Sequence, residues 1–195
     1  MRRVLLVVVL LLFAVGSYSF WKLTYHPNPG TVVETLKKYT DEILGISFLY
    51  PNYPTSYYLE KKDLSTGERL RYTLVLIEDT EENRQLRKGK SPTPREGPTA
   101  ITIDLFQNNL DKQTAIDWVK GSSDSNFKLG DQTYSSATID QMEAVRYRWS
   151  GLYEGESVVA ADEKWIYMLS VTYLTPQDRI RPDFSKVVDT FKVHR

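Results

Sequence analysis

The sequence predicts an α+β domain, an antiparallel β-sheet with helices packed on one face, preceded by an N-terminal transmembrane or signal helix. Several segments alternate apolar and polar residues with the two-residue period of a strand. Short connections such as residues 153–156 suit antiparallel hairpins, because parallel strands need long crossovers. One C-terminal segment has the helical period instead, with Phe184, Val187, Val188 and Phe191 at i, i+3, i+4 and i+7. Runs of strands with separate helices are typical of the α+β class.

The N-terminus carries a targeting signal. Arg2 and Arg3 precede an unbroken apolar run, which is the order of the n-region and h-region of an export signal. Basic residues stay on the cytoplasmic side, so we predict a signal or transmembrane anchor over residues 1–21, with the rest of the chain outside the cytoplasm. Small residues at 14–19 would permit cleavage and secretion. The apolar length of residues 4–21 suits an uncleaved single-pass anchor in the cell membrane, which is the interpretation we prefer.

A spacer and one domain are predicted after this segment. Residues 22–36 are rich in proline and glycine around their middle and are predicted to be a juxtamembrane spacer, followed by a domain at 37–195. The segment 31–44 is ambiguous. Thr31 and Glu34 have the spacing of a helix capping box, whereas the second half of the segment could equally be a strand that pairs with the next one.

The remaining elements follow from apolar periodicity and from turn residues. Pro51 is expected to end the first clear strand, because proline cannot donate a ladder hydrogen bond. Asp111 is expected to cap a short helix that runs to about Lys120. A second helix is expected to open at Pro182. The expected strands are residues 46–50, 57–61, 70–78, 99–106, 134–140, 143–153 and 156–173, the last with a break near 162–163.

A long polar insertion at residues 78–98 is the candidate partner-binding segment. Its basic side chains are those of Arg84, Arg87, Lys88 and Lys90, preceded by acidic residues. Long loops of this kind are often functional. The composition also resembles that of disordered segments, so a solvated mobile loop is the competing interpretation.

Composition makes several chemistries unfavourable. Twenty-five basic residues balance 25 acidic ones, so no overall positive field would attract nucleic acid. The absence of cysteine removes thiolate catalysis and thiolate metal sites. His26 and His194 lie in the predicted spacer and beside the C-terminus, in segments expected to be mobile, so neither suits a catalytic triad or a zinc site. We predict no catalytic residue, no cofactor and no metal site.

Strand alternation also predicts where three charged residues of the expected strands point. Asp104 lies between Ile103 and Leu105, which point to the core, so alternation places Asp104 on the opposite face and predicts that it is exposed. The same rule turns Arg146 and Arg148 outward. There they could pair with acids on neighbouring strands, which we favour, or meet a partner.

The order of the motifs resembles that of the PsbP-like fold group (the Mog/PsbP fold), especially its small membrane-anchored bacterial members. The similarity spans about residues 37 to 193. Gln141-Met142 departs from the family pattern, which usually has a glycine in that turn. The motifs are Gly-Ile-Ser-Phe-Leu-Tyr-Pro at 45–51, a helix containing Trp118, the strand-turn-strand passage at 138–144, and the stretch from Asp183-Phe184 to Thr190-Phe191-Lys192-Val193.

The resemblance implies a strand at residues 37–40 and a role in binding or assembly. PsbP is an accessory protein of the photosynthetic oxygen-evolving complex, and the Mog branch binds a small GTPase. Neither is an enzyme, and no functional motif of either carries over to residues of this chain. We therefore expect a non-catalytic accessory or assembly domain that binds a protein partner at the membrane or cell envelope.

The main alternative is a module that binds a small ligand or cell-wall glycan through exposed aromatic rings. Trp149 and Trp165 are its candidates, together with the tyrosines of the strands, although aromatic residues in strands more often belong to the core. An enzyme is the least favoured class, because no catalytic constellation can be recognised.

Overall fold

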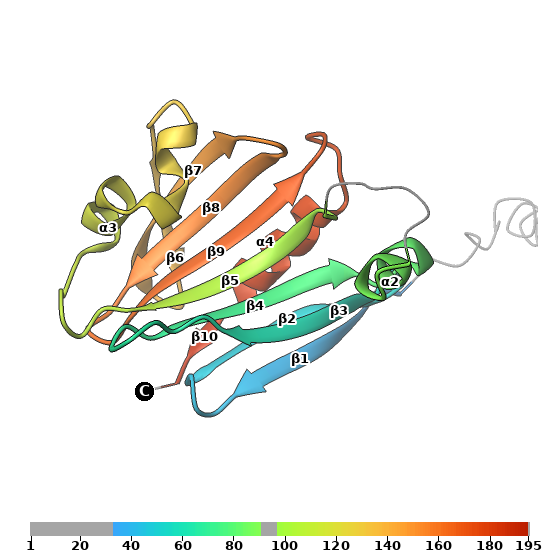
Figure 1. Ribbon diagram of the computed structural model, residues 1–195, viewed down its shortest axis with the longest axis horizontal. Coiled ribbons are helices and arrows are strands. Elements are labelled where there is room, and N and C mark those ends of the chain that lie inside the picture. Colours follow the sequence, from blue (N-terminus) through green and yellow to red (C-terminus); the bar gives the residue numbers. More distant parts are fainter. Residues whose placement is uncertain (1–32, 91–96, 195) are drawn as a thin grey trace, which may run out of the picture. The chain divides into compact units, whose positions relative to one another are not determined.

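The computed structural model describes residues 33–90 and 97–194, which form two antiparallel sheets (Figure 1). The larger sheet has the strand order β3-β4-β5-β9-β8-β7-β6, and the smaller has the order β1-β2-β10. The strands are β1 Thr35–Asp41, β2 Ile46–Tyr53, β3 Tyr57–Asp63, β4 Arg71–Glu78, β5 Ala100–Gln107, β6 Ser135–Ile139, β7 Met142–Ser150, β8 Glu154–Ala161, β9 Trp165–Tyr173 and β10 Lys192–Val193. The helices are α2 Glu81–Arg87, α3 Ala115–Gly121 and α4 Ile180–Thr190, with short 3₁₀ turns at Ser123–Ser125 and Phe127–Leu129.

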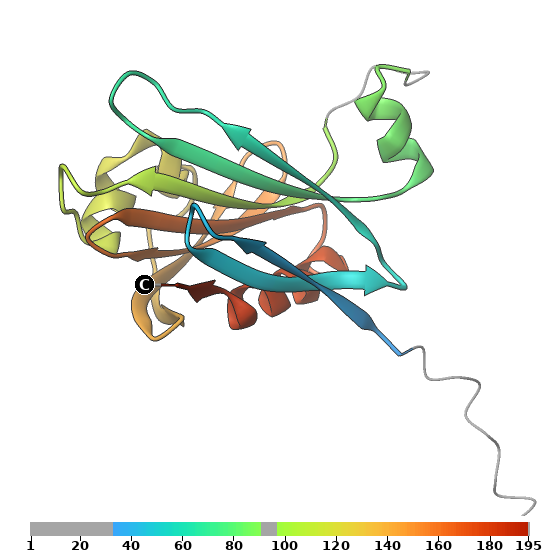
Figure 2. The same cartoon turned by 90° about the horizontal axis from the view of Figure 1, so that it is seen from below.

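The predicted α+β class is confirmed, but the prediction that the helices share one face is wrong. Helix α4 and strand β2 lie side by side and cover one face of the large sheet, against Tyr167 and Leu169 of β9 (Figure 2). Helix α3 covers the opposite face, where Trp118 packs with Ile166 and Met168 of the same strand. Because β9 is apolar on both sides, a single layer of helices could not bury it.

The strand interpretation of the ambiguous N-terminal segment is confirmed. Strand β1 pairs with β2 from Asp41 opposite Ile46 onwards. It begins at Thr35, two residues before the predicted domain boundary, a difference within the usual scatter of element ends. The predicted anchor at 1–21 and most of the spacer lie outside the described residues. Within the described ranges, no helix is long and apolar enough to cross a membrane.

Pro51 does not end its strand, contrary to the prediction. Leu36 lies opposite Pro51 and Thr35 lies opposite Tyr53, so Asn52 has no partner in the register and forms a bulge. A bulge is one of the few places where a ladder accepts proline.

The turn between β6 and β7 has a backbone conformation that usually requires glycine, although it contains none. Asp140 and Gln141 both have positive φ, 45° and 67°, the conformation that glycine usually supplies in a two-residue hairpin. The Asp140 carboxylate accepts a hydrogen bond from the Val193 backbone at 2.8 Å and one from Lys192 Nζ at 2.8 Å. These contacts with β10 hold the turn in a conformation that its side chains disfavour.

Two other elements differ from the predictions. Helix α3 is capped by Thr114, whose Oγ1 accepts from the Asp117 backbone at 3.2 Å, and the predicted cap Asp111 instead pairs with Arg69 at 3.2 Å. The insertion at 78–98 contains helix α2, which begins after the cap Thr80 and projects beyond the end of β4 (Figure 1).

Candidate functional site

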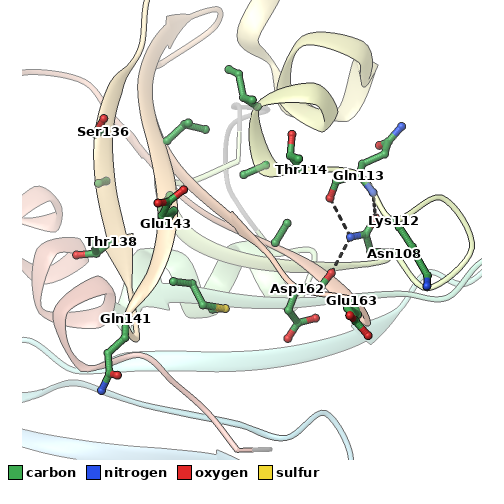
Figure 3. A pocket seen from close by; sticks show the side chains of 17 residues that line it. Asn108, Lys112, Gln113, Thr114, Ser136, Thr138, Gln141, Glu143, Asp162 and Glu163 are labelled. Carbon is green, nitrogen blue, oxygen red and sulfur yellow. Dashed lines mark hydrogen bonds between the residues drawn. The ribbon is translucent and has the colours of Figure 1, made fainter.

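A cavity of about 880 Å³ lies beside strand β6 (Figure 3). One wall is formed by β6 and the first half of β7. The facing wall is formed by the segment that leads into α3 and by the turn between β8 and β9. The elements come from three distant parts of the sequence, so only the folded chain creates this groove, which we call the β6 groove.

Asn108 fixes the wall opposite β6. Its side chain is buried, with Nδ2 donating to the carbonyls of Gln113 at 3.0 Å and Asp162 at 2.7 Å, and Oδ1 accepting from the Gln113 backbone at 2.8 Å (Figure 3). Its own backbone donates to the Lys164 carbonyl at 2.9 Å. Asn108 therefore ties the loop before α3 to the β8–β9 turn and serves the structure of the groove. Sequence reasoning did not single it out, although an asparagine directly after a strand is a turn signal.

Strand β6 forms the open side of the groove. It is the last strand of the large sheet and pairs only with β7. Ser136 and Thr138 are exposed, Ala137 is half-buried and Ile139 is buried. An edge strand leaves a row of backbone N–H and C=O groups without a strand partner. The groove thus combines these groups with the buried, apolar side chain of Ala144 on the adjacent strand.

The charged side chains of the groove are mainly acidic. Glu143 and Glu163 are exposed, and Lys112 is the basic residue of the lining. Asp162 is engaged internally, because its carboxylate accepts from the backbones of Lys164 and Trp165, each at 2.8 Å, and from the Tyr167 hydroxyl at 2.8 Å. The groove is therefore suited to a cationic rather than an anionic guest.

The basic residues predicted to bind a partner lie on and after helix α2, away from the β6 groove. Arg84 donates to both carboxylate oxygens of Asp79 at 3.0 Å each, and these bonds hold the pKa of Asp79 below its ordinary value. Arg87 donates to Asp79 at 3.1 Å and lies 3.7 Å above the Tyr58 ring. Arg87 thus attaches α2 to β3, whereas Arg84 is paired within the insertion itself. Lys88 and Lys90 are exposed at its end.

Asp104 is buried, contrary to the prediction that it is exposed. Alternation did place it opposite Ile103, but Arg71 and the 3₁₀ turn at Asp124 close over that face. The Asp104 carboxylate accepts from Thr73 at 2.6 Å and from Arg71 at 3.4 Å. Burial nevertheless raises the pKa of Asp104 above its ordinary value, against the effect of these two donors.

Two other predictions about polar residues have different outcomes. Arg146 and Arg148 do pair with an acid on the neighbouring strand, Glu156, at 3.0 and 3.8 Å. His194, expected in a mobile segment, is held by its backbone bond to Gly45 at 2.7 Å and by its ring bond to Ser47 at 2.9 Å. Across 33–90 and 97–194, no three potential metal ligands gather into a cluster.

Together these features define an α+β domain with an open groove along one sheet edge. The fold is similar to the solution structure of cyanobacterial PsbP (CyanoP) from Synechocystis sp. PCC 6803. That match covers 87% of this chain and 99% of the other, with a TM-score of 0.48 and 14% sequence identity. The predicted resemblance is confirmed for the fold alone, and no residue role passes from one chain to the other. No family model and no curated protein matches the sequence.

Proposed function

We propose that this chain is a non-catalytic extracytoplasmic accessory or assembly domain that binds a protein partner at the membrane or cell envelope. The partner contributes an extended segment that lies in the β6 groove and adds a strand to the edge of the large sheet. The observation that carries the proposal is that β6, an edge strand with an open backbone, borders a cavity of about 880 Å³.

The dimensions and chemistry of the groove match such a segment. Strand β6 has five residues, which corresponds to an added strand of about 17 Å. Backbone hydrogen bonds would supply affinity, and successive side chains of the guest would alternate between the sheet face of Ala144 and that of Val145. Glu143 and Glu163 favour a lysine or arginine in the guest. The short, polar character of β6 limits indiscriminate pairing with other edges.

The ligand or glycan alternative has less support. Glycan sites use aromatic platforms, and none of the residues lining the β6 groove is aromatic. Trp118 and Trp165 are buried in the two cores. The exposed rings of Tyr53, Tyr58 and Tyr134 come from different segments, and Tyr58 is already covered by Arg87.

The extracytoplasmic placement and the membrane contact rest on the N-terminal signal of residues 1–21. Anchoring there would raise the effective concentration of the domain near a membrane partner, so a modest affinity of the β6 groove would suffice.

Site-specific photocrosslinking in the native membrane tests the proposal. A photoreactive residue is placed in the full-length chain at Ser136 of β6, or at Lys62 as the matched control on the other edge strand, β3. We expect one protein to be captured from Ser136 and not from Lys62. Capture of the same proteins from both positions, or of none from Ser136, would contradict a partner in the groove.

Charge reversal provides a second test and separates the two candidate surfaces. Glu143→Lys should reduce the capture of the partner. Glu68→Lys should leave capture unchanged, because Glu68 lies on an exposed turn and does not line the β6 groove. Combined reversal of Lys88 and Lys90 addresses helix α2. Loss of capture in that variant, with no effect of Glu143→Lys, would move the partner site to the predicted basic segment.

A further inference from the structure

Three arginines converge on one buried carboxylate on the α4 side of the large sheet. Arg146 and Arg148 lie on the same face of β7, Glu156 lies on the adjacent strand β8, and Arg181 comes from the first turn of α4. Arg146 reaches Glu156 at 3.0 Å, Arg181 reaches it at 3.4 Å and Arg148 lies at 3.8 Å. These four residues line a cavity of about 300 Å³, which also has Asp178 at its rim.

The Glu156 carboxylate neutralises only part of the positive charge of the three arginines. Glu156 is 6% exposed and carries one charge against three guanidinium groups. Asp178 supplies a second negative charge, but it is directed to its own loop, accepting from Thr175 Oγ1 at 2.6 Å and from the Leu174 backbone at 2.7 Å. The cavity therefore keeps a positive surplus, although the chain as a whole has a net charge of 0.

Two of the three guanidinium groups are held in position before any guest arrives. Arg181 lies 4.7 Å above the Tyr173 ring and donates to the Pro176 carbonyl at 2.7 Å as well as to Glu156. Arg146 is fixed by its bond to Glu156. Arg148 has an exposed side chain and no hydrogen bond to Glu156 within range, so its donors face solvent beside the cavity. Pre-ordered, planar donors of this kind match the paired oxygens of an oxyanion.

The position of α4 adds to this preference. The helix has eleven residues, and its first turn, including Arg181, faces the cavity. A helix N-terminus carries a partial positive charge and favours anions. Sheet arginines and a helix terminus thus act in the same direction at one place.

We propose that this cavity binds a small phosphate-class oxyanion, held between the guanidinium groups of Arg146, Arg148 and Arg181. Glu156 is a positioning residue that holds two of the arginines in register, and the anion occupies the donors that Glu156 leaves free. The site lies on the α4 face of the sheet and is lined by residues other than those of the β6 groove, so it does not depend on the proposed partner site.

Isothermal titration of the full-length protein in detergent with inorganic phosphate, at constant ionic strength, tests the site. We expect saturable binding of phosphate and not of acetate or chloride. Arg148→Gln should weaken it about tenfold, the size expected for the loss of one charge-assisted contact. Arg148 is suited to this test because it is exposed and its removal leaves Glu156 paired with Arg146. Arg69→Gln, which removes an exposed arginine elsewhere, should leave phosphate binding unchanged.

Two further measurements complete the design. Arg181→Lys keeps the charge but removes the planar fork, so it should weaken phosphate binding by several-fold while the protein stays folded. Glycerol phosphate distinguishes free phosphate from a phosphate group on a larger molecule, and binding of either supports the site. Absence of saturation with both phosphates, equal binding of acetate, or equal loss in Arg69→Gln and Arg148→Gln would overturn the proposal.

Discussion

Replacement of Gly155 by alanine should destabilise the domain through a single contact. Gly155 lies opposite Trp149 in the β7–β8 ladder, and the indole ring covers it. A Cβ at Gly155 would lie 2.3 Å from Trp149 Cε2 and 2.4 Å from Cζ2, more than 1 Å inside ordinary contact distance. The ring cannot simply tilt away, because Nε1 donates to Ser157 Oγ at 3.0 Å.

The loss of unfolding free energy can be estimated from the contacts of the indole ring that the substitution disturbs. Displacing the indole breaks the bond to Ser157, worth about 1 kcal/mol, and disturbs its packing against the α3-side core, where overpacking typically costs about 1–3 kcal/mol. Alanine recovers some of this, because glycine in a strand loses more conformational entropy on folding, by roughly 0.5–1 kcal/mol. We expect Gly155→Ala to lower the free energy of unfolding by about 1–3.5 kcal/mol, a large part of the roughly 5–15 kcal/mol of a typical domain.

Urea denaturation followed by tryptophan fluorescence measures this loss. Gly151→Ala is the matched control, because a Cβ there meets no atom within 4 Å, and its effect should be small. A double-mutant cycle with Trp149→Ala isolates the cause. If the clash is responsible, Gly155→Ala should cost almost nothing once the indole is absent. An equal cost in both backgrounds would show that the contact with the indole ring is not the cause.

Three further predictions concern buried charge and capping. Burial raises the pKa of Asp104, so the folded state binds the proton of this carboxyl more tightly than the unfolded state does and loses stability as the pH rises above about 4. The free energy of unfolding of Asp104→Asn, measured in urea and compared with that of wild type, should therefore increase towards pH 7. Tyr57→Phe removes the 2.8 Å hydrogen bond to the buried Asp183 carboxylate and should cost about 1–3 kcal/mol of unfolding free energy. Thr80→Ala removes the cap of α2, which contains no buried residue, so hydrogen exchange should accelerate in α2 by about fivefold while global unfolding is unchanged.

Each of these expectations has a specific contrary result. An advantage of Asp104→Asn that shrinks with rising pH would mean that the ionised carboxylate stabilises the fold. An unchanged urea midpoint for Tyr57→Phe would show that the ion pairs of Asp183 with Arg179 and Lys186 are enough to stabilise its buried carboxylate. A fall in global stability in Thr80→Ala would mean that α2 belongs to the cooperative core.

The contacts of the basic residues of the 78–98 insertion could be predicted only in part from the local sequence. Arg84, Arg87, Lys88 and Lys90 were predicted to lie on a polar insertion; Arg87, Lys88 and Lys90 are exposed there and Arg84 is half-buried. The sequence did not reveal that Asp79 and the Tyr58 ring bind the two arginines. Tyr58 is distant in the chain and is brought near only by pairing of β3 with β4. Two of the four cations are therefore occupied by the fold itself.

The β6 groove could not be predicted from the sequence, because no segment that lines it has a recognisable motif. Its walls are ordinary strand and loop residues, and Asn108 matters only because it joins the segment before α3 to the β8–β9 turn. That β6 is an edge strand follows from the strand order of the whole sheet. Strand order depends on long-range pairing, whereas alternation along a strand reports only which side chains share a face.

The properties that repeat along the chain can be predicted from its amino-acid order. The two-residue period identified most strands, the i, i+3, i+4, i+7 pattern identified α4, and alternation correctly placed Asp104 opposite Ile103. What covers each face of the sheet depends on the folded chain. Helix α3, Arg71 and a 3₁₀ turn close the face that was expected to be open. Three arginines from two elements surround Glu156. Periodicity is a local consequence of backbone geometry, whereas burial and charge pairing arise from contacts between segments that the chain brings together only on folding.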